Sequence, residues 1–162
     1  MRDTVDTITK YTLVFLMGLL VVDVVWQVFT RYVLGSPSIF TDELARFLLI
    51  WVSFLGAAYA SGQHMHLSID LLSHRLSPAG QKKLAIFIHS VVLLFVITVL
   101  VIGGSVLVYY THIYGQLSST LQVPIAYVYS IGPISGLLIL YYKLSDIKRI
   151  LTQTPAEYIE NL

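Results

Sequence analysis

The first residues that could do chemistry are Asp23, Gln27 and Arg31, which follow one another at intervals of four. In a helix this spacing places three side chains on one face. Asp23 interrupts an apolar run, and a carboxylate in a membrane is costly unless it faces protein or water. It could hold a proton or a sodium ion, or it could be a polar contact to a neighbouring helix or subunit. A single carboxylate without a second acidic partner makes a poor coupling site, which favours the polar contact.

A second group of charges lies between Thr41 and Arg46. Thr41 can cap a helix whose first turn contains Asp42 and Glu43, where the helix dipole favours carboxylates. The two acids precede Arg46 by four and three residues, which allows a local ion pair. One interpretation is simple capping. The other is a site for the basic side chains of a partner.

Other motifs give little support for catalysis. His64 and His66 are two residues apart without neighbouring carboxylates or thiolates, which is a weak metal signal, and the chain has no cysteine. His89 is more typical of an interhelical hydrogen bond than of a proton carrier. The sequence contains no Walker motif, no His-Glu-x-x-His and no nucleophile elbow. We therefore predict no catalytic residue, no cofactor and no metal.

The composition is that of a membrane protein. Hydrophobic residues make up 56% of the 162 residues and charged residues 12%, whereas soluble domains contain about 25% charged residues. The mean hydropathy is +0.77, so the lipid bilayer is the expected solvent. The net charge of +1 gives no reason to expect a nucleic-acid partner.

Four apolar runs predict four transmembrane helices, at about 11–29, 44–60, 84–108 and 123–142. The first, of 19 residues, spans roughly 28 Å as a helix, which is enough to cross the hydrocarbon core. No Asp, Glu, Lys or Arg occurs between Lys83 and Lys143, and a polar loop at 109–122 divides that stretch. Pro133 predicts a kink in the last helix.

Charges outside these runs predict the orientation. Eight Lys and Arg residues lie on the side that holds both termini and the 61–83 loop, and only Arg31 and Arg46 lie on the other. The positive-inside rule therefore places both termini in the cytoplasm.

The 67–76 segment alternates apolar and polar residues, which predicts a short amphipathic helix lying in the membrane interface; a plain extension of a neighbouring helix is the alternative. Residues 1–150 would form the membrane unit, and 151–162 a polar tail.

The order of several motifs resembles a known family. The motifs are Trp26-Gln-Val-Phe-Thr-Arg31-Tyr32, Gly35-x-Pro37, Thr41-Asp-Glu43-Leu-Ala-Arg46, Trp51-x-x-Phe-Leu-Gly56-Ala57-Ala58, His66-Leu-Ser-Ile-Asp70, Leu121-Gln-Val-Pro124 and Tyr129-x-x-x-Pro133-x-x-Gly136. Across residues 5–150 or so, they resemble the small membrane subunit, of the DctQ type, of tripartite ATP-independent periplasmic (TRAP) transporters.

The resemblance implies a multi-pass subunit in the bacterial inner membrane. Its implied partners are a large membrane subunit, which moves an organic acid such as a sialic acid or a dicarboxylate by sodium symport, and a periplasmic substrate-binding protein. This chain would be a non-catalytic scaffold that helps to dock the binding protein. A free-standing four-helix membrane enzyme or exporter, using Asp23 and the histidines, is the alternative.

Two surfaces follow as expectations. Small residues permit close helix contact, so the subunit interface is expected to use the Gly56 and the Gly132-x-x-x-Gly136 faces; Asp23, Gln27, Arg31 and Arg46 are further candidates. The loops opposite the termini are expected to dock the binding protein. The candidate docking residues are Asp42, Glu43, Tyr114, Ser118 and Ser119.

Overall fold

The computed structural model describes residues 2–36, 38–63 and 78–152. Within them, four helical segments are long and apolar enough to cross a membrane: Arg2–Tyr32, Ile39–Gly62, Gly80–Ile113 and Ile125–Thr152. The predicted all-α fold with four transmembrane helices is confirmed. The amphipathic helix expected at 67–76 and the tail from residue 153 onward lie outside the described residues.

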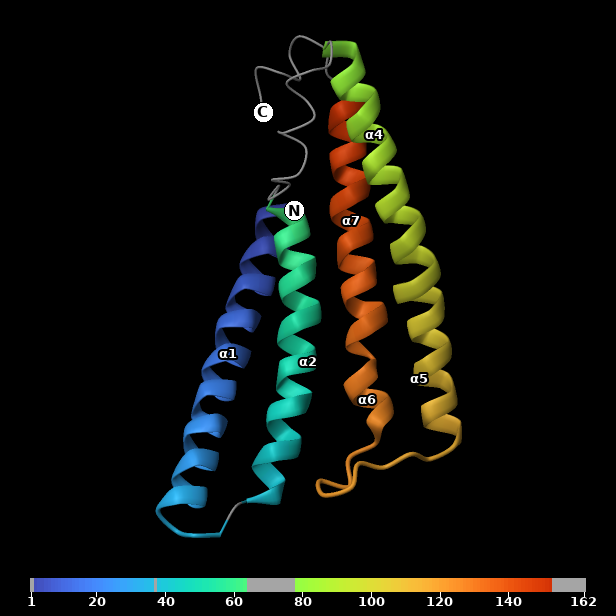
Figure 1. Ribbon diagram of the computed structural model, residues 1–162. Coiled ribbons are helices and arrows are strands. Elements are labelled where there is room, and N and C mark those ends of the chain that lie inside the picture. The colour runs from blue at the N-terminus through green and yellow to red at the C-terminus, as the bar shows by residue number, and fades with distance from the viewer. Residues whose placement is uncertain (1, 37, 64–77, 153–162) are drawn as a thin grey trace.

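The first two spans form a hairpin of α1 (Arg2–Tyr32) and α2 (Ile39–Gly62), shown in Figure 1. Both helices extend beyond the apolar runs at 11–29 and 44–60. The side of α1 that is buried or half-buried follows a seven-residue repeat, with residues spaced alternately by four and three: Thr9, Leu13, Leu16, Leu20, Asp23, Gln27 and Thr30. Such a stripe lets one helix pack along another while the remainder of its surface stays exposed.

The third span contains a π-helical segment. It runs through α4 (Pro78–Phe95), the π-helix η1 (Val96–Gly103) and α5 (Gly104–Ile113), where the sequence indicated one helix at 84–108. The Thr98 hydroxyl donates to the Leu94 carbonyl at 2.8 Å, which satisfies an acceptor where the helical ladder is altered. Gly103 and Gly104 follow, and small residues there allow the fourth span to approach closely.

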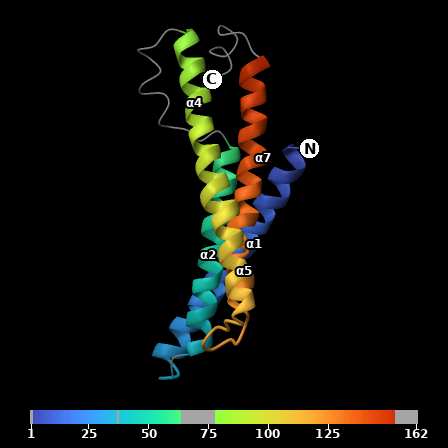
Figure 2. The same ribbon diagram turned by 90° about the vertical axis from the view of Figure 1, so that its right-hand side faces the viewer.

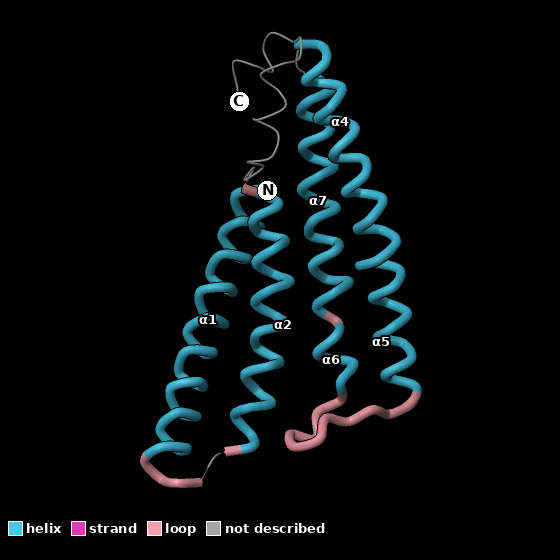
Figure 3. The backbone as a smooth tube through the Cα atoms, in the orientation of Figure 1, coloured by secondary structure: helices cyan, strands magenta, loops and turns pink. Residues whose placement is uncertain are grey.

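The fourth span is divided into α6 (Ile125–Tyr129) and α7 (Ile131–Thr152), as the loop-coloured break in Figure 3 shows. Pro133 lacks the N–H that would bond the Tyr129 carbonyl, so the ladder is interrupted one turn before the proline. The kink predicted from Pro133 is therefore present, at Ser130. Pro124 immediately precedes α6, and α7 continues beyond residue 142, the predicted end of the span.

The helices form a row instead of a closed bundle. α2 packs between α1 and α7, and α7 packs between α2 and the α4–η1–α5 helix; Figures 1 and 2 show the row from two directions. In the most apolar window of the fourth span 44% of residues are buried, against 6% in that of α1. The fourth span is thus the centre of the fold, and most of α1 faces the surroundings.

A polar network joins three helices at the end of the row where α1 begins, which we call the Arg2 end. The Arg2 guanidinium donates to Asp146 on α7 at 2.9 Å and to the Gly62 carbonyl on α2 at 2.6 Å. The Tyr142 hydroxyl on α7 donates to Asp6 on α1 at 2.6 Å. These bonds hold the start of α1 against the middle of the row.

Candidate functional site

At the opposite end of the row, which we call the Glu43 end, the loop that follows α1, at 33–36, and the loop at 114–124 lie at the same end as the start of α2 (Figure 1). Asp42 forms the ion pair with Arg46 that the spacing predicted. It also accepts a hydrogen bond from the Gln27 amide of α1 at 3.3 Å. Asp42 therefore ties the two helices of the hairpin together at their loop end.

The predicted cap of α2 is wrong. The helix begins at Ile39, with Ser38 as the N-cap residue, so Thr41 lies inside the first turn. The Thr41 hydroxyl donates to the Ser38 carbonyl at 2.9 Å. Apolar Ile39 and Phe40 allow the helix to begin one turn earlier than the capping pattern at Thr41 indicated.

Glu43 makes a contact that local sequence patterns do not reveal. Its carboxylate accepts three consecutive backbone N–H groups, from Ser119 at 3.1 Å, Thr120 at 2.9 Å and Leu121 at 2.7 Å. These residues follow Glu43 by 76 to 78 positions. The structure thus separates the acidic pair: Asp42 bonds within the hairpin, and Glu43 bonds the loop between α5 and α6.

The other candidate docking residues have different surroundings. Tyr114 is 70% exposed and stacks on Tyr110, with ring centroids 6.1 Å apart. Ser119 is exposed. Ser118 is buried, and its hydroxyl accepts the Val123 N–H at 3.2 Å. Tyr114 and Ser119 are therefore available to a partner, whereas Ser118 shapes the loop from within.

The three polar residues of α1 differ in burial. Asp23 and Gln27 belong to the buried stripe of α1, but Arg31 is exposed; its guanidinium lies 5.8 Å from the Tyr32 ring centroid. The buried residue after Gln27 is Thr30 and not Arg31. The packed side of a helix is followed better by alternating steps of four and three residues than by repeated steps of four. Arg31 therefore lies outside the buried stripe that contains Asp23 and Gln27.

Asp23 is buried where α1 packs on α2. The residue is 6% exposed, and its Oδ2 atom has no hydrogen-bond partner among the described residues. A side chain sealed in this position is not accessible to a substrate in solution.

Replacing Asp23 by Leu should therefore stabilise the protein. A buried polar group without a partner costs about 1–3 kcal/mol, so the thermal unfolding midpoint in detergent should rise by several degrees. Gln27→Leu is the matched control on the same stripe: it loses the bond to Asp42 and should not raise the midpoint. A lower midpoint for Asp23→Leu would show that the carboxylate has a stabilising partner.

The small residues expected at a subunit interface fall into two groups. A Cβ atom added at Gly136 would lie 3.0 Å from side-chain atoms of Leu100 and Val101, so Gly136 is used for packing within the chain. A Cβ added at Gly56 or at Gly132 would meet nothing within 4 Å. The glycine motif of the fourth span thus serves the fold at Gly136, and Gly56 remains a candidate for contact with another protein.

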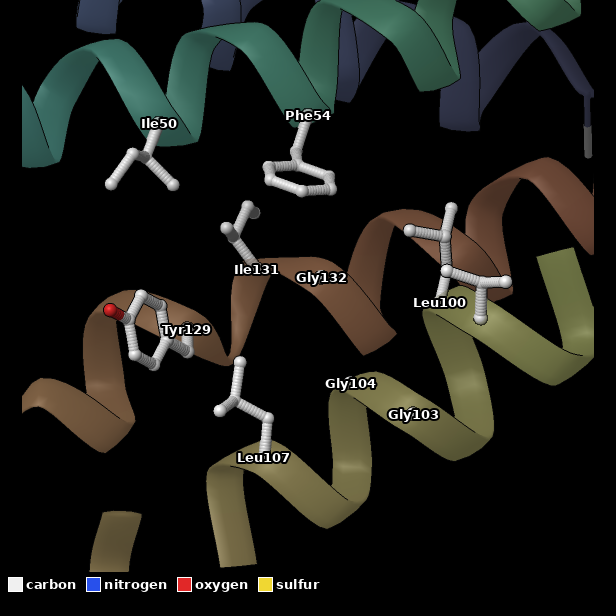
Figure 4. Close-up of a pocket in the computed structure, with 10 residues that line it drawn as sticks. Ile50, Phe54, Leu100, Gly103, Gly104, Leu107, Tyr129, Ile131 and Gly132 are labelled. Atoms are coloured by element: carbon white, nitrogen blue, oxygen red, sulfur yellow. The ribbon is translucent and has the colours of Figure 1, made fainter.

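An apolar groove opens between α2, the α5 side of the third span and the fourth span. It has a volume of about 390 Å³, and Figure 4 shows Ile50 and Phe54 across from Leu107, with Gly132 on the groove wall. Among its lining residues the Tyr129 hydroxyl is the only polar side-chain group. A groove of this chemistry suits hydrocarbon and has no cation to hold an organic anion.

Two groups of the alternative enzyme that the structure describes, Asp23 and His89, are not brought together. Asp23 lies on α1, at one edge of the row, and His89 lies on α4, at the other edge (Figure 1). His64 and His66 lie outside the described residues. Within the described residues, no group of three or more His, Cys, Asp or Glu side chains could hold a metal ion.

The polar network at the Arg2 end was not predicted, although the sequence carries a signal for it. Arg2 and Asp6 are four residues apart, so they lie on one face of a helix. Lys143 and Asp146 stand three apart at the end of the last apolar run. Paired charges at the same membrane level on two helices could have indicated a contact between them.

Fold and site define a four-span helical membrane protein whose described groove is apolar. The family model for the DctQ component of tripartite ATP-independent periplasmic transporters matches residues 20–153. The chain belongs to this family and is a multi-pass protein of the inner membrane.

Three relatives are similar over different lengths. The chain is 29% identical over 103 residues to the sialic acid TRAP transporter small permease protein SiaQ of Vibrio cholerae serotype O1, covering 64% of this chain and 60% of that one. It is 28% identical to the ectoine TRAP transporter small permease protein TeaB of Halomonas elongata, covering 91% and 78%. It is 26% identical to the isethionate TRAP transporter permease protein DctMQ of Oleidesulfovibrio alaskensis, covering 70% of this chain but 18% of that protein.

Proposed function

We propose that this chain is the non-catalytic small membrane subunit of a sodium-driven TRAP transporter that imports an organic acid. It would scaffold a large membrane subunit, which carries out sodium-coupled transport, and help to dock a periplasmic substrate-binding protein. The observation that carries the proposal is the lack of transport chemistry within the spans: the groove is apolar and Asp23 is sealed between α1 and α2.

The row of helices supports a scaffolding role. A closed bundle hides its apolar side chains inside, but in this row both edge helices present long apolar faces. Large side chains on α1 such as Phe15, Val22 and Val25 are more than half exposed. These faces suit lipid and the apolar surface of another membrane protein alike.

The comparison with DctMQ supports a large membrane partner. That relative is named as a permease, and this chain covers only 18% of it, so a segment similar to this chain occurs within a much longer permease. The relatives are named for sialic acid, ectoine and isethionate. We infer that substrate choice lies with the large subunit and the binding protein.

Orientation is part of the proposal. The excess of Lys and Arg at the Arg2 end supports a cytoplasmic location for that end. The Glu43 end would then face the periplasm, where the binding protein is found. Its loops carry exposed groups such as Tyr114 and Ser119.

Co-purification tests the scaffolding role. The chain, tagged at its C-terminus, would be produced together with the large subunit of the same transporter, extracted in mild detergent and passed over a sizing column. We expect the two to elute together at a constant ratio. If the large subunit elutes alone while this chain stays folded, the scaffolding role is refuted.

A further inference from the structure

The loop between α5 and α6 has a defined shape that depends on few bonds. Leu117 and Pro124 form an isolated bridge, and the Ser118 N–H donates to the Val123 carbonyl at 2.9 Å. Between them, Gln122 adopts a positive φ of 53°, a conformation that is uncommon for residues other than glycine. The tip of the loop is therefore a tight turn, and the Gln122 amide supports it from within by donating to the Ser118 and Ser119 carbonyls at 3.1 Å each.

Glu43 adds support from a second element, α2. Its two carboxylate oxygens accept the N–H groups of Ser119, Thr120 and Leu121, three consecutive amides at the tip. A cradle of consecutive N–H groups is a recurrent way of holding an anion. Hydrogen bonds to an ionised acceptor are also stronger than those between neutral groups. One side chain on α2 thus fixes a loop that belongs to the other half of the row.

The neighbouring carboxylate does not share this role. Asp42 is directed instead to Arg46 on α2 and to Gln27 on α1. The two acids differ by one position in the chain and carry the same charge. Asp42 is therefore a matched control for any effect that depends on charge alone.

We propose that Glu43 is a positioning residue for docking: it holds the 114–124 loop in the conformation that the periplasmic binding protein recognises. The inference rests on the proposed docking function. Glu43 is half-buried and its carboxylate is engaged by the loop amides, so it acts through the exposed residues that it positions at the tip, Ser119 and Thr120. Loss of the clamp weakens docking and leaves assembly and the transport step unchanged.

The test uses the complete complex in vesicles, with uptake measured over a range of binding-protein concentrations. Glu43→Gln keeps the shape of the side chain but removes the charge. Glu43→Asp keeps the charge but shortens the reach to the loop. Each should raise the half-saturating concentration of binding protein about tenfold, as expected from losing charge-assisted hydrogen bonds. The rate at saturation should change less than about twofold, and Asp42→Asn should resemble the wild type in both quantities.

Hydrogen exchange of the same complexes measures the protection of the loop amides directly. The amides of residues 119–121 should exchange faster in both Glu43 variants than in the wild type and in Asp42→Asn. Faster exchange with an unchanged half-saturating concentration would overturn the inference, because the loop shape would not matter for docking. Wild-type docking by Glu43→Asp would also overturn it, in favour of a direct charge contact. If wild-type uptake does not depend on the binding protein, the proposed docking function itself fails.

Discussion

Replacing Asp146 by Asn should lower the thermal unfolding midpoint of the purified protein strongly. Asp146 is 2% exposed, lies 2.9 Å from the Arg2 guanidinium and 4.0 Å from the Lys143 ammonium, and Lys143 is itself 1% exposed. Neutralising Asp146 removes this carboxylate from beside the buried Lys143 ammonium and the partly exposed Arg2 guanidinium. Removing one member of a buried ion pair typically costs about 3–5 kcal/mol.

Asp3→Asn provides the control for this change. Asp3 is exposed near the same end of α1, so its neutralisation alters the net charge equally without touching the network. The midpoints would be measured in the same detergent by circular dichroism. If Asp146→Asn unfolds at the same temperature as Asp3→Asn, the network at the Arg2 end does not hold α1, α2 and α7 together.

Replacing Gly136 by Leu should also destabilise the isolated chain. The fourth span packs on η1 at this point, where even a Cβ would lie 3.0 Å from Leu100 Cβ and from a Val101 methyl group. A leucine must therefore separate the two helices, and overpacking of this kind costs about 1–3 kcal/mol. The thermal midpoint should fall, and the large subunit should be lost as a secondary effect.

Gly56→Leu is the contrasting variant. Space is open beside Gly56, so the isolated chain should keep its thermal midpoint. Loss of the large subunit from this folded variant would identify the Gly56 face as a contact between subunits. An equal fall in midpoint for both leucine variants would contradict the packing described for Gly136.

The four spans could be predicted from the sequence because lipid imposes a simple requirement for long apolar runs. The ends of the spans could not be predicted. The helices extend beyond the apolar runs to include charged residues such as Arg2 and Asp146, which bond each other between α1 and α7. The π-helical segment was also not predictable: residues 96–103 are apolar apart from Thr98, and a single threonine in a membrane helix does not indicate a changed hydrogen-bond pattern. The segment was found only in the structure, where α7 packs against it.

The candidate site was predictable where contacts are local. The pair of Asp42 and Arg46 follows from a spacing of four on one helix. The role of Glu43 could not be predicted in this way, because its partners are backbone N–H groups 76 to 78 residues away. Every residue other than proline has such a group, so the residue types do not indicate the contact. Gly136 shows a similar limit: its motif indicates close packing but does not say whether the neighbour belongs to the same chain.

Uptake by reconstituted vesicles tests the central claim most directly. Vesicles would contain this chain alone, the large subunit alone, both together or neither, with the binding protein, labelled substrate and an inward sodium gradient supplied to all. If this chain is a non-catalytic subunit, vesicles that contain it alone should take up no more substrate than empty vesicles. Vesicles with both subunits should take up substrate in a sodium-dependent manner, and faster than those with the large subunit alone. Sodium-dependent uptake by this chain alone would contradict the account.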